Sequence, residues 1–149
     1  MTLRNWFAKT ATRTDVLLLD ASVWIGAKVR ADRYFEASRA LAVDPDHLVA
    51  GLDLTLYEIA NGLGVRQGHR PEAMDLCRLV SGRCGRNLLA VDAQLLDSAL
   101  GIAAEHGLTA YDAAYVAAAR RHGWTLVSAD IADLVSKGLA VTPDAALYP

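Results

Sequence analysis

The chain has 149 residues, of which 53% are hydrophobic and 21% are charged, a balance typical of one globular domain with a sizeable core. Its formal net charge of −2 argues against a strongly basic protein that coats DNA, but it leaves room for a local nucleic-acid site. No apolar run approaches the length of a membrane span, so we expect no membrane partner.

The first residues of the chain have a composition of their own. Residues 1–15 carry three basic residues and no acidic residue before Asp15. A transit peptide has such a composition, and so does a frayed, solvated N-terminus, which we favour; the apolar stretch of a secretory signal is missing. We therefore expect an N-terminal extension over residues 1–15 and a single domain over residues 16–149.

Beyond this segment, short apolar runs alternate with longer stretches of helical character. The runs are continuous, as expected for parallel strands that are covered on both faces. The expected strands are residues 16–20, 47–50, 87–91, 124–128 and 139–142. The expected helices are residues 22–29, 33–43, 53–67, 71–81, 92–106, 110–122 and 131–137. This alternation predicts an α/β sandwich with right-handed crossovers.

The cysteines and histidines do not form a recognisable metal site. Cys77 and Cys84 are the only cysteines, too few for a disulfide framework, and no histidine lies at zinc-finger spacing from them. We interpret both as buried thiols in a reducing cytoplasm.

Acidic residues follow two of the expected strands. Asp20 ends the first strand, and Asp130 follows the fourth strand by two residues. In an open parallel sheet, the carboxyl ends of the strands line the groove where ligands bind. Both carboxylates are therefore expected at that edge.

Two more acids lie in otherwise apolar helical stretches. Glu58 is the only charged residue between Asp53 and Arg66, and Asp112 is the only charged residue of residues 110–119. A lone carboxylate in apolar surroundings requires a partner, and a cation would serve.

Each acid except Glu58 also has a local explanation. Asp20 and Asp130 could cap the helices that follow them. The sequence "TAYD" (109–112) fits a capping box with Thr109 as the cap. Taken singly, a capping role is about as well supported as a catalytic one.

Together, the four acids point to a metal site. Oxygen ligands without paired cysteines or histidines suit Mg²⁺ or Mn²⁺. Clustered carboxylates repel one another unless a cation is bound, and one or two ions could activate a water for attack on a phosphodiester. We therefore expect one site built from Asp20, Glu58, Asp112 and Asp130.

Four blocks of the sequence resemble the PIN domain in its VapC-type bacterial toxin form. They are "LLLDASVWI" (17–25), "LTLYEIANGL" (54–63), "HGLTAYDAAYVAAARRHG" (106–123) and "TLVSAD" (125–130). The resemblance runs from about residue 16 to residue 142. It implies a three-layer sandwich whose central parallel sheet has the order 3-2-1-4-5. It also implies Mg²⁺-dependent endoribonuclease activity on RNA with Mn²⁺ as a substitute, a homodimer, and a VapB-type antitoxin bound across the site.

The resemblance also assigns roles to residues. The catalytic and metal-binding acids carried over block by block are Asp20, Glu58, Asp112 and Asp130. Ser22 matches a small polar position that helps to hold a metal-bound water, and Ser128 matches a hydroxyl position before the last acid. We interpret Asp133, one helical turn after Asp130, as a solvated residue rather than a fifth ligand.

Arginines concentrate just after the helix that contains Glu58, and they could bind RNA phosphates. They are Arg66, Arg70, Arg78, Arg83 and Arg86. The alternative, a solvated pair of helices with Glu72 and Asp75 as ionic partners, is equally open.

Other functions fit less well. A haloacid-dehalogenase-type phosphatase requires a second aspartate two residues after the first, where Ser22 stands. A receiver domain requires paired acids at the first strand and a lysine after the last. The main alternative is a catalytically silent PIN-like module that binds RNA or a protein, although the presence of all four acids speaks against it.

Overall fold

The structure of the protein is a computed structural model that describes residues 15–149. The expected N-terminal extension therefore lies outside the described residues, apart from Asp15. Within the described part of the chain, no helix is long and apolar enough to span a membrane.

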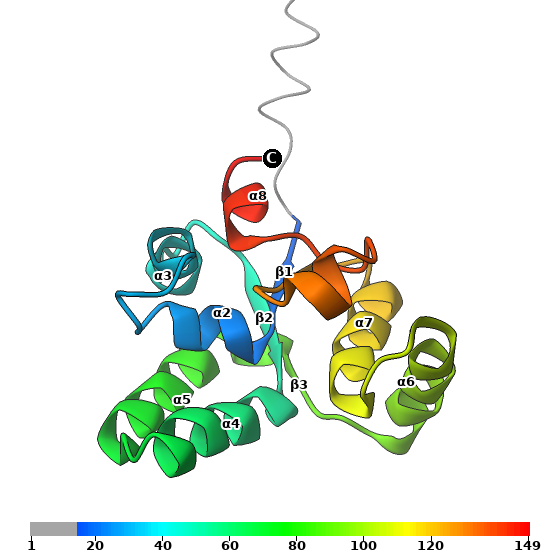
Figure 1. The fold of residues 1–149 in the computed structure, drawn as a ribbon, viewed down its shortest axis with the longest axis horizontal. Coiled ribbons are helices and arrows are strands. Elements are labelled where there is room, and N and C mark those ends of the chain that lie inside the picture. The colour runs from blue at the N-terminus through cyan, green and yellow to red at the C-terminus, as the bar shows by residue number, and fades with distance from the viewer. Residues whose placement is uncertain (1–14) are drawn as a thin grey trace, which may run out of the picture.

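Helices and strands alternate along the chain (Figure 1). The strands are β1 (Leu17–Leu19), β2 (Val49–Leu52), β3 (Leu88–Leu89) and β4 (Thr125–Val127). The α-helices are α2 (Ala21–Gly26), α3 (Phe35–Val43), α4 (Asp53–Ile59), α5 (Arg70–Cys84), α6 (Ala93–His106), α7 (Ala110–His122) and α8 (Pro143–Leu147). The π-helical segments η1 (Ala60–Arg66) and η3 (Ile131–Val135) and the 3₁₀ turn η2 (Gly85–Asn87) complete the described elements.

The strands form one parallel sheet in the order β3-β2-β1-β4, which confirms the predicted α/β fold and the order of the first four strands. The expected fifth strand is reduced to a single parallel bridge between Val127 and Val141. It ends on its C-terminal side at Thr142, whose side chain caps helix α8. The sheet order therefore holds, with a fifth position only one residue long.

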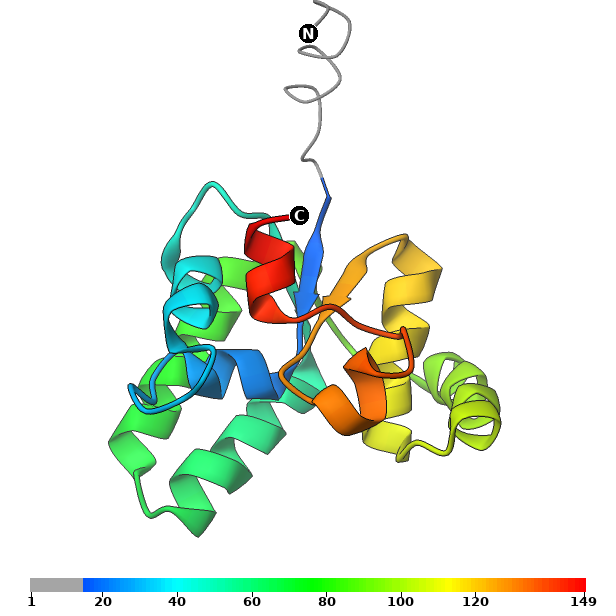
Figure 2. The same ribbon diagram turned by 45° about the horizontal axis from the view of Figure 1, so that its top comes forward.

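The side chains of the strands alternate between two apolar cores. Leu18, Leu52 and Leu126 face the core that includes α6 and α7. Leu19 and Val127 face the core that includes α2, α3 and α5. Figure 2 shows these helices on either side of the sheet. The continuous apolar runs of the sequence follow from this arrangement, because both faces of each strand are covered.

Helix α7 is the most deeply buried of the described helices. Every residue from Ala113 to Ala119 is buried. Six of these seven positions are alanine or valine, so the helix can approach the sheet and α6 closely. Because α7 leads directly into β4, it runs antiparallel to the strands, and its first turn lies at the carboxyl edge of the sheet.

The two ends of the described chain lie at the opposite edge. Asp15 and Pro149 line the same hollow of about 350 Å³, at the amino end of β1, as Figure 1 also shows for the C-terminus.

Candidate active site

Asp20 lies where β1 passes into α2. Its backbone N–H donates to the Val127 carbonyl oxygen at 3.2 Å, which continues the pairing of β1 with β4. Its carboxylate accepts the Val23 N–H at 3.4 Å and so caps α2. The side chain is only 6% exposed. The capping role considered from the sequence is therefore real, and it coexists with a position at the carboxyl edge of the sheet.

Two serines connect the segments that follow β1 and β4. Ser22 Oγ donates to Asp20 Oδ1 at 2.5 Å and accepts the Ala129 N–H at 2.9 Å. Ser128 is fully buried, and its Oγ accepts the Asp130 N–H at 3.0 Å. Both serines thus fix the backbone around the acids that they flank.

Glu58 reaches the site from α4. It is half-buried, and its Oε1 accepts a hydrogen bond from the Tyr115 hydroxyl at 2.7 Å. The same hydroxyl lies 2.7 Å from Thr55 Oγ1. Neither partner is among the site residues expected from the sequence. The available signal was their spacing, since Thr55 precedes Glu58 by one helical turn and Tyr115 follows Asp112 by one turn.

Three aspartates meet at the start of α7 and η3. The Asp112 N–H is capped by Thr109 Oγ1 at 3.1 Å, as the capping box predicts. Asp130 Oδ1 accepts the Asp133 N–H at 3.0 Å. Carboxylate oxygens of Asp112, Asp130 and Asp133 all lie within 4.8 Å of one another. Asp133 is exposed, as expected, yet it adjoins the pair of expected ligands, and Lys137 Nζ lies 3.8 Å from its Oδ1.

Negative charges of the site raise the pKa of neighbouring acids, in a series that runs from Asp20 to the start of α7. Burial raises the pKa of Asp20 to about 6, against hydrogen bonds from Ser128 and Ser22, and Glu58 adds to the rise. Burial also raises the pKa of Glu58, with a further contribution from Asp112.

The series continues at the start of α7. Burial raises the pKa of Asp112, and the negative charges of Asp130 and Asp133 raise it further. Within residues 15–149, no salt bridge reaches Asp20, Glu58, Asp112 or Asp130. Four segments carry these acids and come together at one edge of the sheet: the end of β1, α4, the start of α7 and η3 (Figure 1).

The arginines after Glu58 do not form one group. Arg83 donates to the carbonyl oxygens of Ala42, Asp44 and His47 at 2.7–3.0 Å. Its guanidinium is therefore engaged by the protein backbone, which makes Arg83 a weaker candidate for RNA binding than the exposed arginines. Arg78 pairs with Asp75 at 3.2 Å, as the alternative interpretation expects.

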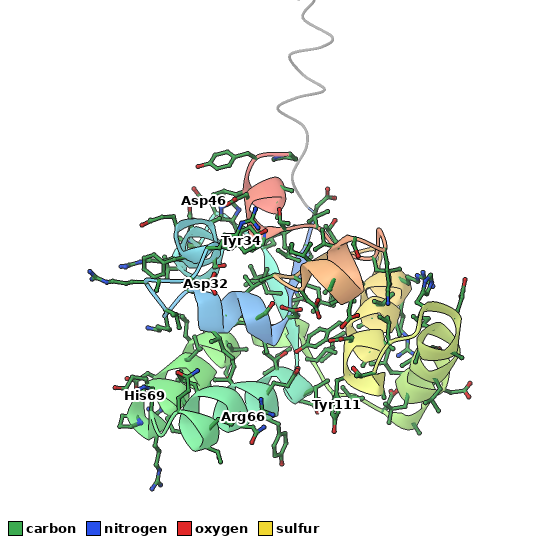
Figure 3. The ribbon with its side chains drawn as sticks, viewed as in Figure 1. Asp32, Tyr34, Asp46, Arg66, His69 and Tyr111 are labelled. Carbon is green, nitrogen blue, oxygen red and sulfur yellow. The ribbon has the colours of Figure 1, made fainter. Side chains whose placement is uncertain are left out.

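The three remaining arginines of the set have exposed side chains that a ligand could contact. Arg66 (Figure 3), Arg70 and Arg86 are all exposed. Cys77 and Cys84 are free thiols; Cys84 is buried as expected, whereas Cys77 is only half-buried.

Residues 17–133 match the PIN domain family, a span that contains all four expected acids. The chain belongs to the PIN domain family. The resemblance to VapC-type toxins is confirmed as well, because the chain is 33% identical over 118 residues to Ribonuclease VapC3 from Pyrobaculum aerophilum. That match covers 76% of this chain and 88% of the relative.

Solved structures share this PIN fold. PAE2754 from Pyrobaculum aerophilum is 26% identical with a TM-score of 0.62, and the match covers 89% of this chain and 94% of that one. A toxin–antitoxin complex from Klebsiella pneumoniae is 19% identical with a TM-score of 0.62, covering 85% and 97%.

The donor chemistry of the PIN site fits a hard divalent cation. The clustered ligand atoms are carboxylate oxygens, which suit Mg²⁺ or Mn²⁺. Neither cysteine nor histidine belongs to the cluster found among the described residues, so the softer donor sets that favour zinc are not present there.

Proposed function

We propose that this PIN-domain protein is a metal-dependent endoribonuclease and the toxin of a VapBC-type toxin–antitoxin pair. The observation that carries the proposal is the convergence of five acids at the carboxyl edge of the sheet, with carboxylate oxygens of three of them within 4.8 Å of one another. The relationship to Ribonuclease VapC3 supports RNA as the substrate. Because the site lacks cysteine and histidine donors, Mg²⁺ is the proposed cation and Mn²⁺ its substitute.

The proposed roles follow the position of each residue. Asp20, Glu58, Asp112 and Asp130 hold the cation, and Ser22 and Ser128 fix the backbone on either side of the first and last of them. When bound, such a cation lowers the pKa of a water and stabilises the charge on a phosphodiester. The uncompensated carboxylates would themselves repel a phosphate, so we expect RNA to enter the site only when their charge is neutralised.

The substrate would be held by exposed cations outside the acid cluster. Arg66, Arg70 and Arg86 are exposed on the segment that follows α4, where their guanidinium groups can bind phosphates. Arg83 is left out of this proposal because it binds backbone carbonyls.

The proposed partner is a VapB-type antitoxin. A solved structure that shares this fold is a toxin–antitoxin complex. An inserted arginine or lysine of the partner could neutralise the acids as a metal does, with charge-assisted hydrogen bonds in a partly desolvated site. We further propose that the protein acts in the cytoplasm and as a homodimer, which light scattering at micromolar concentration would test.

The decisive experiment incubates the purified protein with total cellular RNA, with and without Mg²⁺, and maps the cuts by primer extension. Discrete cuts that require Mg²⁺, and that disappear when the ion is chelated, are expected. The Asp112→Asn variant controls for contaminating nucleases, because a contaminant would cut RNA equally well in its preparation. If the folded protein bound RNA but left it intact at every Mg²⁺ concentration, the silent binding module would be the correct function.

A further inference from the structure

The buried Tyr115 hydroxyl lies between the two helices that carry the central acids of the site. Tyr115 is only 1% exposed and follows Asp112 by one turn of α7. Across the interface, Thr55 and Glu58 are one turn apart on α4, and both contact the Tyr115 hydroxyl at 2.7 Å. One phenol oxygen thus contacts two polar side chains of α4.

The chemistry of these groups sets the direction of the hydrogen bonds. An ionised Glu58 can only accept, so the Tyr115 O–H donates to it. The Tyr115 oxygen then accepts the Thr55 O–H, and Thr55 Oγ1 accepts the Leu52 N–H at 3.4 Å. Each donor is therefore followed by a matching acceptor, and such chains strengthen their members.

Glu58 depends on this chain for its orientation. Among residues 15–149, the Tyr115 hydroxyl is the one hydrogen-bond donor observed on the Glu58 carboxylate, and no salt bridge holds it. A glutamate side chain has several rotatable bonds, and fixing them before a ligand binds avoids an entropic penalty at the binding step.

We propose that Tyr115, supported by Thr55, is a positioning residue that orients Glu58 for the divalent cation. This inference rests on the proposed function only in its choice of ligand. Tyr115 does not itself touch the reacting atoms. It holds Oε1 of Glu58, and the second carboxylate oxygen has no partner observed within residues 15–149.

The test is Mn²⁺ binding, measured by calorimetry or by the loss of the free-ion electron paramagnetic resonance signal, without RNA. Tyr115→Phe removes one hydroxyl and keeps the buried ring. We expect binding to weaken about 10- to 100-fold, the range typical when a partner of a metal ligand is removed. Glu58→Gln should weaken binding as well, and the double variant Y115F/E58Q should bind no more weakly than Glu58→Gln alone.

A matched control is available on the same helix. Tyr111→Phe also deletes one tyrosine hydroxyl, at the position before Asp112. Tyr111, however, lies exposed at the start of α7 (Figure 3), and its side chain is 61% accessible. Its Mn²⁺ affinity should equal that of the wild type. The Thr55 hydroxyl can be tested in the same way. Thr55→Val removes it and should weaken Mn²⁺ binding, whereas Thr55→Ser keeps it and should bind Mn²⁺ as the wild type does.

The possible outcomes are distinct. Wild-type Mn²⁺ affinity in a folded Tyr115→Phe variant overturns the inference, whatever the activity. If Tyr115→Phe does not fold, the comparison of Thr55→Val with Thr55→Ser decides: equal affinity in both overturns the inference. A wild-type protein that binds Mn²⁺ but never cuts RNA would refute the proposed function and leave this inference standing, provided that Tyr115→Phe binds more weakly.

Discussion

Individual carboxylates in this protein combine a local structural role with a place in the site. Asp20 caps α2 and Asp130 caps η3, so the capping interpretation of each residue is correct. A cap uses one oxygen of a carboxylate, which leaves the group available for a second interaction. A capping role at a helix terminus therefore does not argue against a role in catalysis.

Asp112 offers the clearest test among the four acids. Asp112→Asn keeps the size of the side chain and removes its charge, so we expect cleavage to fall by more than the roughly 10- to 100-fold loss typical of indirect partners. Without metal, the variant should melt at the same or a slightly higher temperature, because the repulsion from Asp130 and Asp133 is relieved. RNA cleavage and thermal denaturation measure the two effects, and a marked drop in melting temperature would contradict the second.

Asp20 should make the metal-free protein less stable as the pH rises. Its pKa is about 6 in the folded state, against an ordinary value of 3.8. Between these values the folded chain retains a proton that the unfolded chain has released, so the free energy of unfolding falls as pH rises from about 4 to about 6 and then levels off. The loss is at most about 3 kcal/mol.

The measurement is chemical denaturation in EDTA across this pH range. Asp20→Asn should flatten the decline and stabilise the metal-free protein at pH values above the decline. Asp97→Asn, at an exposed position of α6, is the control and should keep the wild-type decline. A wild-type protein that became more stable over the same range would show the opposite sign.

At the scale of elements, Arg83 connects the end of α3 to α5. Its guanidinium donates to three carbonyl oxygens in and after α3. Arg83→Ala should lower the free energy of unfolding by about 1–3 kcal/mol and leave the RNA cleavage rate of the folded protein unchanged. Arg86→Ala, three residues later and exposed, should change stability by less than about 0.5 kcal/mol. Equal stability of the two variants in urea denaturation would refute this assignment.

Elements defined by local signals could be predicted from the sequence. Helix α7 spans the expected residues 110–122, because Thr109 caps its start and Gly123 takes the left-handed conformation after its end. The carboxyl-edge position of Asp20 and Asp130 also followed from the strand pattern.

Elements shaped by distant contacts could not be predicted in this way. The expected helix 53–67 divides at Ala60 into α4 and η1, and a side chain at Gly64 would come within 3.3 Å of Ala73 on α5. Gly64 and the π-helical geometry of η1 thus occur where η1 packs closely against α5. The pairing of Tyr115 with Glu58 likewise joins residues 57 positions apart, beyond the reach of any local pattern. Helix α8 was missed although Thr142 and Pro143 carry the usual signals of a helix start.

At the scale of the whole molecule, an acidic site and exposed arginines should give RNA binding a distinct salt dependence. Replacing Arg66, Arg70 and Arg86 together by glutamine should weaken single-stranded RNA binding on all sequences alike. The slope of log affinity against log salt should become shallower by about 0.7 for each phosphate that these arginines no longer neutralise. RNA binding is measured by filter binding, with all variants carrying Asp112→Asn so that the RNA is not cleaved during the assay. An unchanged slope would show that RNA binds elsewhere.

The antitoxin and the metal should compete for the same carboxylates. If the partner inserts a cation among Asp20, Asp112 and Asp130, its apparent affinity should decrease as Mg²⁺ rises through the millimolar range. Titration of the antitoxin by calorimetry at several Mg²⁺ concentrations measures this. An affinity indifferent to Mg²⁺ would instead favour a partner that covers the RNA path while the metal stays in place.

The location of the two ends of the described residues has a practical consequence for such measurements. Asp15 and Pro149 share one hollow at the amino edge of the sheet, whereas the acids lie at the carboxyl edge. A tether, fluorophore or fusion partner attached after Pro149 therefore projects away from the site. A surface-immobilised protein held by this end presents its acids to RNA and antitoxin in solution, while coupling through Lys137, beside Asp133, would place the support against the site itself.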